Sequence, residues 1–179
     1  MRNKSHRYTF SSEPLFTIPL FSADLSLDNE TILDYCTNLW DRDPGRDVSN
    51  SGGWQSNDIP VLPEELERLF VDIHTFAEEC CEELEISPVK VYNMWVNINQ
   101  YKDFNWPHDH SDSALAGVYY VKTPNNCGDI AFEHPVEDKM TIMPSVEGRL
   151  YIFPAWLRHR VNPNMSREER VSISFNLDH

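Results

Sequence analysis

The clearest pattern along the chain is a helical one between residues 63 and 84. Its apolar side chains recur at spacings of three, four and seven residues: Leu66, Leu69, Phe70, Ile73, Phe76, Ala77, Cys80 and Leu84. This spacing places them on one face of a helix, so we expect an amphipathic helix from Pro63 that packs on a flat apolar surface. A shorter helix is predicted over residues 29–41, where Asp28 or Asn29 can cap the first turn.

From residue 88 onward the pattern changes to short strands, in which apolar and polar side chains alternate with period two. Their predicted ranges are close to 89–99, 115–122, 128–133, 139–142, 149–154, 158–162 and 170–177. An earlier strand, with prolines typical of a sheet edge, is predicted over residues 14–21. Two helices followed by seven or more strands predict a mainly β fold with α (α+β), in which the helices buttress one sheet of a sandwich or jelly roll.

The length of 179 residues fits one domain. We therefore expect a single domain over residues 1–179, with an N-terminal strand and helices over 1–87 and a jelly-roll core over 88–179. The stretch 42–60 is predicted to be a long loop, and long loops in compact domains are often lids or binding loops. Trp54 in this loop either faces a substrate or, as we favour, pins the loop to the body of the domain.

The charge of the chain narrows its possible partners. Fifteen basic and twenty-nine acidic residues give a net charge of −14, which argues against a nucleic acid or an anionic membrane as the main partner. Residues 1–4 do not resemble the start of a signal peptide, and no apolar run is long enough to span a membrane. The four cysteines form no CxxC pair, so we expect them to be reduced and the protein to be cytoplasmic.

Metal-capable side chains gather just before the strand predicted over 115–122. In an extended segment, His108, His110 and Asp112 would all point to one face. Imidazole and carboxylate ligands suit Fe(II), and a set of three leaves coordination positions open. His159 is the best candidate for a ligand from a distant strand, because the other histidines lie at the termini, on a helix or at a strand end. The alternative is that the His108–His110 pair is a solvated loop feature without a metal.

The last predicted strand has one polar and one apolar face. Its polar residues are Arg170, Ser172, Ser174 and Asn176, and they alternate with Val171, Ile173, Phe175 and Leu177. A polar face turned into a barrel requires partners, because unpaired buried polar groups are costly. The guanidinium of Arg170 suits a carboxylate, and the hydroxyl of Ser172 would add a donor. The alternative is an exposed sheet face on which Arg170 forms a surface ion pair.

Taken in order, these segments resemble the Fe(II)- and 2-oxoglutarate-dependent oxygenases of the prolyl-hydroxylase-like superfamily. The resemblance covers residues 90–177, roughly half of the chain. It rests on the segments Trp95-Val96-Asn97, Pro107-His108-Asp109-His110, Ala116-Gly117-Val118-Tyr119-Tyr120, Gly148-Arg149-Leu150-Tyr151-Ile152-Phe153-Pro154, His159-Arg160-Val161 and Glu169-Arg170-Val171-Ser172-Ile173-Ser174-Phe175-Asn176.

The resemblance implies a double-stranded β-helix (jelly roll, cupin-like) and a metal site made by His108, His110 and His159. Asp112 is the alternative second ligand, because His110-Ser111-Asp112 is also an H-x-D triplet. The number of residues between each candidate and Tyr120 favours His110, the earlier of the two, as the second ligand.

The resemblance also implies the cosubstrate and the reaction. Tyr120, Arg170 and Ser172 would bind 2-oxoglutarate, and Fe(II) and O2 would complete the set of cofactors. The enzyme would be a dioxygenase that hydroxylates a peptidyl side chain or a small molecule and releases succinate and CO2. Two other functions are considered: a cupin-like metalloenzyme without 2-oxoglutarate, and a non-catalytic jelly-roll binding module that uses Trp54, Trp106 and Trp156. The sequence leaves the oligomeric state open.

Overall fold

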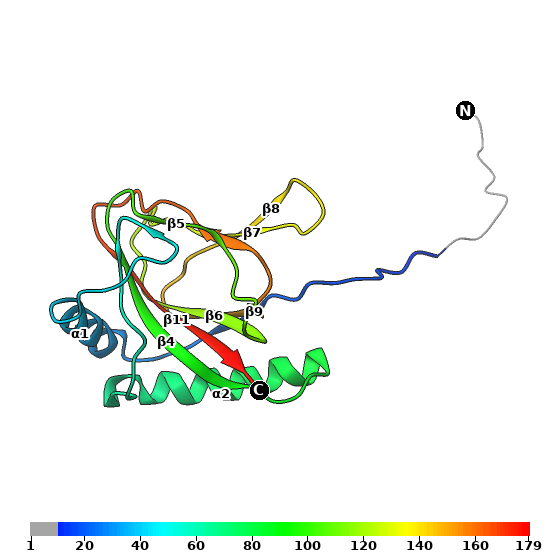
Figure 1. Cartoon of the computed structure of the whole chain (residues 1–179), viewed down its shortest axis with the longest axis horizontal. Helices are drawn as coiled ribbons and strands as arrows, with labels where there is room; N and C mark the ends of the chain where they lie inside the picture. Colours follow the sequence, from blue (N-terminus) through cyan, green and yellow to red (C-terminus); the bar gives the residue numbers. More distant parts are fainter. Residues whose placement is uncertain (1–10) are drawn as a thin grey trace.

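The computed structural model describes residues 11–179, in which two antiparallel sheets face each other and helices cover one of them (Figure 1). The larger sheet has the strand order β1-β9-β6-β11-β4-β3, and the smaller one the order β2-β5-β10-β7-β8. The elements are β1 Phe21–Asp24, α1 Asn29–Trp40, β2 Asn50–Ser51, β3 Trp54–Gln55, α2 Glu64–Leu84, β4 Lys90–Asn99, β5 Phe104–His108, β6 Leu115–Lys122, β7 Ile130–Glu133, β8 Met140–Met143, β9 Arg149–Pro154, β10 His159–Val161 and β11 Arg170–Asp178.

Both predicted helices are confirmed, and their ends have identifiable causes. The side chain of Asp28 accepts a hydrogen bond from the backbone N–H of Thr31 and so caps α1. Helix α2 follows Pro63, whose extended backbone conformation starts the helix, and three glutamates lie in its first turn, where the helix dipole favours negative charge. It ends at Glu85, which adopts the left-handed conformation typical of a helix end.

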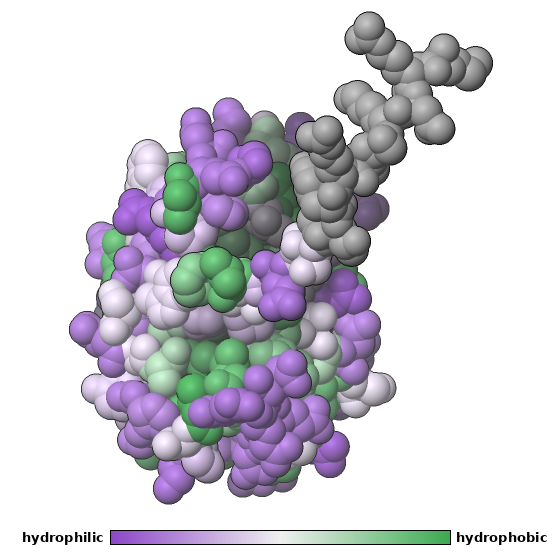
Figure 2. All heavy atoms as spheres, turned by 90° about the vertical axis from the view of Figure 1, so that its right-hand side faces the viewer, coloured by the Kyte–Doolittle hydropathy of each residue, from purple (hydrophilic) through white to green (hydrophobic). Residues whose placement is uncertain are grey.

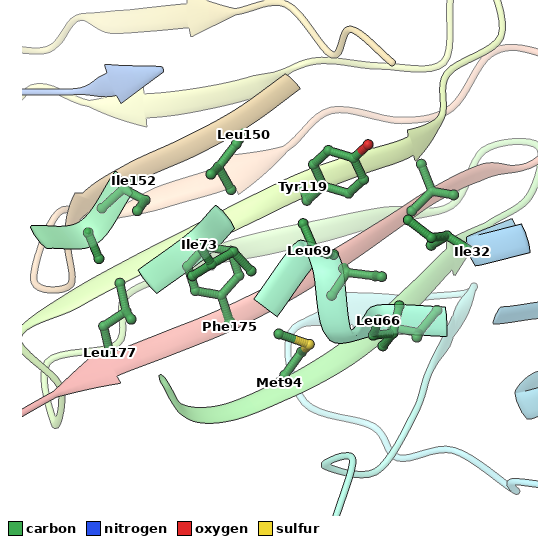
Figure 3. Packing of buried hydrophobic residues seen from close by; sticks show 14 of the residues in the cluster. Ile32, Leu66, Leu69, Ile73, Met94, Tyr119, Leu150, Ile152, Phe175 and Leu177 are labelled. Atoms are coloured by element: carbon green, nitrogen blue, oxygen red, sulfur yellow. The ribbon is translucent and has the colours of Figure 1, made fainter. Parts of the chain in front are cut away.

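Helix α2 packs its apolar face against the larger sheet, on the side away from the smaller sheet (Figure 1). Figure 3 shows Leu66, Leu69 and Ile73 lying against side chains of the sheet that include Phe175 and Leu177, and all five are fully buried. Burying one such side chain contributes about 1.5–3 kcal/mol relative to leaving it exposed. This core fixes the larger sheet, and the sheet in turn carries half of the candidate site on its other face.

The alternation predicted for the last strand is observed in β11. Val171, Ile173, Phe175 and Leu177 belong to the core under α2. The polar residues between them point to the space between the two sheets, because side chains alternate across a strand. Strand β11 lies between β4 and β6, so its polar face forms the middle of the cavity floor.

Three local expectations are corrected. Residues 14–20 are not a strand; β1 begins only at Phe21 and pairs with β9, which gives the backbone there its hydrogen-bond partners. Residues 104–108, which lie outside every predicted strand, form β5, and β5 pairs with β10 on one side and with β2 on the other. The stretch 42–60 is mostly irregular but contains β2 and β3. Local sequence does not reveal these short strands, because pairing with distant strands forms them.

The role favoured for Trp54 agrees with its contacts. Its indole N–H donates to the carbonyl of Asp43 at 3.0 Å, and its ring packs 6.4 Å from that of Trp40. It does not line the main cavity. Trp54 thus holds loop 42–60 against the domain.

The surface seen from the right-hand side of Figure 1 is mostly hydrophilic, with apolar side chains gathered in its lower half (Figure 2). Among residues 11–179, neither helix is both long and apolar enough to cross a bilayer. The expectation about a signal peptide concerns residues 1–4, which lie outside the described part of the chain.

Candidate metal centre and cosubstrate pocket

Two of the candidate ligands sit directly opposite each other on neighbouring strands of the smaller sheet. His159 on β10 pairs in register with His108 on β5, and on its other side with Phe132 on β7. Because residues directly opposite each other point to the same face of a sheet, the two imidazoles come together, with ring centroids 4.4 Å apart. The face to which they point lines the cavity between the sheets.

His110 reaches the same place from beyond the end of β5. Its backbone N–H donates to the carbonyl of Ala155 at 2.8 Å, which holds the chain close to the end of β9. The His110 ring lies 5.1 Å from that of His108 and 5.3 Å from that of His159. One nitrogen from each ring can be chosen so that all three lie within 4.8 Å of one another.

Asp112 does not join this cluster. Strand β5 stops at His108, and Asp112 is exposed in the turn that follows. The alternation that would have brought Asp112 to the same face as His108 is therefore absent, and the histidines are grouped by tertiary contacts.

Hydrogen bonds orient two of the imidazoles. Nδ1 of His108 donates to the carbonyl of Trp106 at 2.7 Å, and Nδ1 of His159 donates to that of Leu157 at 2.9 Å. A carbonyl only accepts, so the proton is fixed on Nδ1 and the lone pair of Nε2 is left for a metal.

Burial keeps the three rings neutral. Loss of hydration is the main cause that lowers the pKa of His108, lowers that of His110 to about 4 and lowers that of His159 to about 3. Metal binding requires neutral imidazole, so these rings need no deprotonation at pH 7. Three imidazole nitrogens fit a divalent first-row transition metal, Fe(II) among them.

A buried cation lies in the same cavity, which has a volume of about 400 Å³. Arg170 on β11 is 1% exposed, and its Nη1 donates to the carbonyls of Cys127, Gly128 and Asn162 at 2.6, 3.0 and 3.3 Å. Its Nη2 has no hydrogen-bond partner in the described part of the chain. Among residues 11–179 no carboxylate forms a salt bridge with Arg170, so the alternative of a surface ion pair is not observed.

Two hydroxyl groups accompany this guanidinium. Ser172 on β11 pairs in register with Tyr120 on β6, and both are buried residues of the cavity wall. Burial raises the pKa of Tyr120 to about 12, so its phenol stays protonated and can donate. A buried cation beside two hydroxyls, with no salt bridge to any carboxylate of the described residues, fits the carboxylate of a bound anion.

The structure therefore brings all six preferred site residues to one cavity: His108, His110, His159, Tyr120, Arg170 and Ser172. The histidines judged less suitable lie elsewhere. His74 accepts from the N–H of Val91 and bonds to the carbonyl of Phe70, His134 accepts in a turn, and His6 is outside the described residues.

Other residues of the cavity wall were not singled out as site residues. They include Arg46 and Ser49 from loop 42–60, and a row on β4 that is made of Asn93, Trp95, Asn97 and Asn99. The period-two spacing of the row on β4 was a usable signal, because it mirrors the polar face of β11. No comparable pattern surrounds Arg46 in the sequence.

Comparison with known proteins points to one enzyme family. The family model described as "Putative 2OG-Fe(II) oxygenase" matches residues 93–176, which include all six residues. A search of the curated proteins found no match.

Among solved structures, a prolyl-4-hydroxylase from Pseudomonas putida is similar at a TM-score of 0.71 and 13% identity, over 91% of this chain and 94% of that one. The epimerase SnoN from nogalamycin biosynthesis is similar at a TM-score of 0.73 and 16% identity, over 89% of this chain and 77% of that one. The viral collagen prolyl hydroxylase of Paramecium Bursaria Chlorella virus-1 is similar at a TM-score of 0.58 and 15% identity, over 88% of this chain and 94% of that one.

These structures confirm the predicted double-stranded β-helix fold. Residues 93–176, just under half of the chain, thus match the family of Fe(II)- and 2-oxoglutarate-dependent oxygenases, enzymes that use Fe(II), 2-oxoglutarate and O2.

Proposed function

We propose that His108, His110 and His159 hold the iron of this oxygenase, as the sequence predicts. The support is their common position in one cavity, with ligand nitrogens within 4.8 Å of one another and neutral rings. Asp112 was the alternative second ligand. Its exposed position in a turn favours His110 for that role.

We also propose that Arg170, Tyr120 and Ser172 bind the carboxylate of 2-oxoglutarate that lies far from the metal. The observation that carries this proposal is Arg170 itself, a buried guanidinium with a free Nη2 and no carboxylate among residues 11–179 to pair with it. The three backbone carbonyls hold Nη1 in place, so Nη2 has a fixed direction before any ligand binds. Such preorganisation reduces the entropy lost on binding.

The protein contributes orientation and exclusion of water. When bound, Fe(II) supplies the activation of O2, which is coupled to conversion of 2-oxoglutarate to succinate and CO2 and to oxidation of the substrate. Phe153 and Phe132 pack beside His159, with ring centroids 4.9 and 5.8 Å away. These rings keep water from the back of the metal site and hold the imidazole in one orientation.

For the substrate, we propose hydroxylation of a peptidyl side chain or a small molecule. Relatives of similar fold include prolyl hydroxylases and an epimerase from nogalamycin biosynthesis, so both kinds of substrate occur on this scaffold. The net charge of −14 makes a nucleic acid a poor candidate, because its phosphates would be repelled.

We further propose that the protein works in the cytoplasm. All four cysteines are unpaired and buried, and burial raises the pKa of Cys36 and of Cys80 to about 12. Such thiols are unreactive and have no disulfide role, as is usual in a reducing compartment.

The test is turnover of 2-oxoglutarate. Purified protein is supplied with Fe(II), O2 and 2-oxoglutarate, and succinate is measured without any substrate added. Slow succinate formation that depends on Fe(II) and is lost in His159→Ala is expected. The matched control is His134→Ala, whose imidazole lies outside the cavity and should leave turnover unchanged. Absence of both turnover and 2-oxoglutarate binding in the metal-loaded protein would refute the assignment of this site.

A further inference from the structure

The buried polar atoms that lack hydrogen-bond partners are concentrated in one place. In the described part of the chain there are four such side-chain atoms: Nε of Arg46, Oδ1 of Asn93, Nη2 of Arg170 and Oδ1 of Asn176. All four residues line the cavity that holds the three histidines. Leaving a buried donor or acceptor unpaired costs about 1–3 kcal/mol, so native proteins contain few. Their concentration here indicates a surface shaped for ligands.

These four residues fall into two groups on opposite sides of the histidine cluster. Arg170 pairs in register with Asn99, whereas Asn176 pairs with Asn93 at the far end of the same two strands. Six residues of strand span about 20 Å. Between the two ends lies Trp95, whose ring packs 5.8 Å from that of His110. The group at the Asn176 end is therefore on the other side of the metal site from the proposed cosubstrate anchor.

A third element of the far group comes from loop 42–60. Nη2 of Arg46 donates to Asp58 at 2.5 Å, and Nδ2 of Asn93 donates to the other carboxylate oxygen of Asp58 at 3.3 Å. The guanidinium of Arg46 also lies 5.8 Å over the ring of Trp95. A carboxylate only accepts, so Asp58 fixes the amide of Asn93 with its nitrogen outward to the loop. The oxygen of Asn93 is then unused, as is Nε of Arg46.

This arrangement defines what a ligand must offer. Asp58 balances the charge of Arg46, so the group presents hydrogen-bonding atoms and little net charge: one donor from Arg46, and two acceptors from Asn93 and Asn176. A phosphate or carboxylate offers only acceptors and would leave both asparagine oxygens unpaired. An ammonium offers only donors and would leave Arg46 unpaired. A planar amide offers both an N–H donor and a C=O acceptor.

We propose that Arg46, Asn93 and Asn176 form a substrate subsite that recognises an amide group. The proposal rests on the proposed function, because it places the substrate across the metal site from 2-oxoglutarate. The amide C=O accepts from Nε of Arg46, and its N–H donates to the asparagine oxygens. All three side chains are partly exposed, so small rotations bring these atoms to the ligand. The amide belongs either to a peptide segment or to a small carboxamide.

Binding to the full-length protein tests the subsite separately from catalysis. The protein is loaded with Zn(II), which does not turn over, and 2-oxoglutarate binding is measured first by calorimetry. Ligand-observed NMR then compares twenty N-acetyl amino-acid N-methylamides with the matching methyl esters, which lack the second N–H. A second arm compares asparagine and glutamine with aspartate and glutamate. Binding in the first arm identifies a peptide source, and binding only in the second identifies a free carboxamide.

We expect at least one amide to bind about three- to tenfold more tightly than its ester or acid counterpart, the value of one hydrogen bond. Asn176→Ala and Arg46→Lys should each remove that preference. Asn38→Ala, on the exposed face of α1, is the matched control and should keep it. Thermal unfolding verifies that each variant is folded, and Asn93→Ala replaces either variant that is not.

The possible failures are distinguishable. If the wild-type protein does not bind 2-oxoglutarate, the proposed function is wrong. If it binds 2-oxoglutarate but does not prefer any amide, or if the preference survives in the folded subsite variants, the subsite is wrong and the proposed function stands.

Discussion

The substitution Arg170→Lys tests the cosubstrate anchor most directly. In the wild type, Nη1 is committed to three backbone carbonyls at 2.6–3.3 Å, while Nη2 is free for a ligand. Lysine keeps the positive charge but has a single nitrogen on a flexible stem. That nitrogen can satisfy either the carbonyls or the carboxylate of 2-oxoglutarate, but it cannot meet both with good geometry.

The expected loss of binding or of stability follows because one lysine nitrogen cannot serve both sets of acceptors. A hydrogen bond to a charged group contributes about 1.5–3 kcal/mol. Loss of one such bond at about 2 kcal/mol corresponds to about 30-fold weaker binding of 2-oxoglutarate. If the lysine turns to the ligand instead, the buried carbonyls lose their donor, and the free energy of unfolding should fall by about 1–3 kcal/mol. One of the two losses must appear.

Calorimetric titration of 2-oxoglutarate into the Zn(II)-loaded protein measures the first loss, and chemical denaturation of the ligand-free protein measures the second. Arg160→Lys is the matched control, because Arg160 is exposed on β10 and should change neither quantity. An Arg170→Lys protein that binds 2-oxoglutarate within twofold of wild type, with unchanged stability, would show that the guanidinium does not anchor the cosubstrate.

Three further predictions concern the metal site and its support. His110→Ala should lower the bound iron measured by elemental analysis, whereas Asp112→Ala should not; the opposite result would make Asp112 the ligand. The metal-free protein should lose stability as the pH falls below about 6.5, because His159 takes up a proton there in the unfolded chain, whereas folding holds its pKa at about 3. Between pH 7 and pH 5 this one group should lower the free energy of unfolding by about 2 kcal/mol. Chemical denaturation measures this change, and a free energy of unfolding that stays constant across that range would contradict the prediction. Gly128→Ala should lower both stability and 2-oxoglutarate affinity in the same assays, because Gly128 has φ +82° and a Cβ there would meet the carbonyl oxygen of Asn162 at 2.2 Å. If neither quantity changes, the loop around Gly128 does not position Arg170.

Much of the fold was predictable because it depends on local patterns. The apolar stripe of α2 and the alternation in β11 each require burial of one face, and this requirement leaves few arrangements for the two elements. The short strands β2 and β3 and the true start of β1 were not predictable, because they exist only where distant strands supply hydrogen bonds. The expected strand over 14–21 failed for this reason: its residues have strand-like composition but no partner before Phe21.

The candidate site shows the same division. The sequence by itself determined which side chains we propose for the chemistry: the imidazoles of His108, His110 and His159, and the guanidinium of Arg170 on a strand with one polar face. Only the tertiary structure decided that Asp112 stays outside, because β5 ends at His108 and the chain then turns. It also decided that Arg46 from loop 42–60 borders the cavity. Periodicity reports which face of an element is buried, whereas the meeting of two distant segments depends on how the whole chain packs.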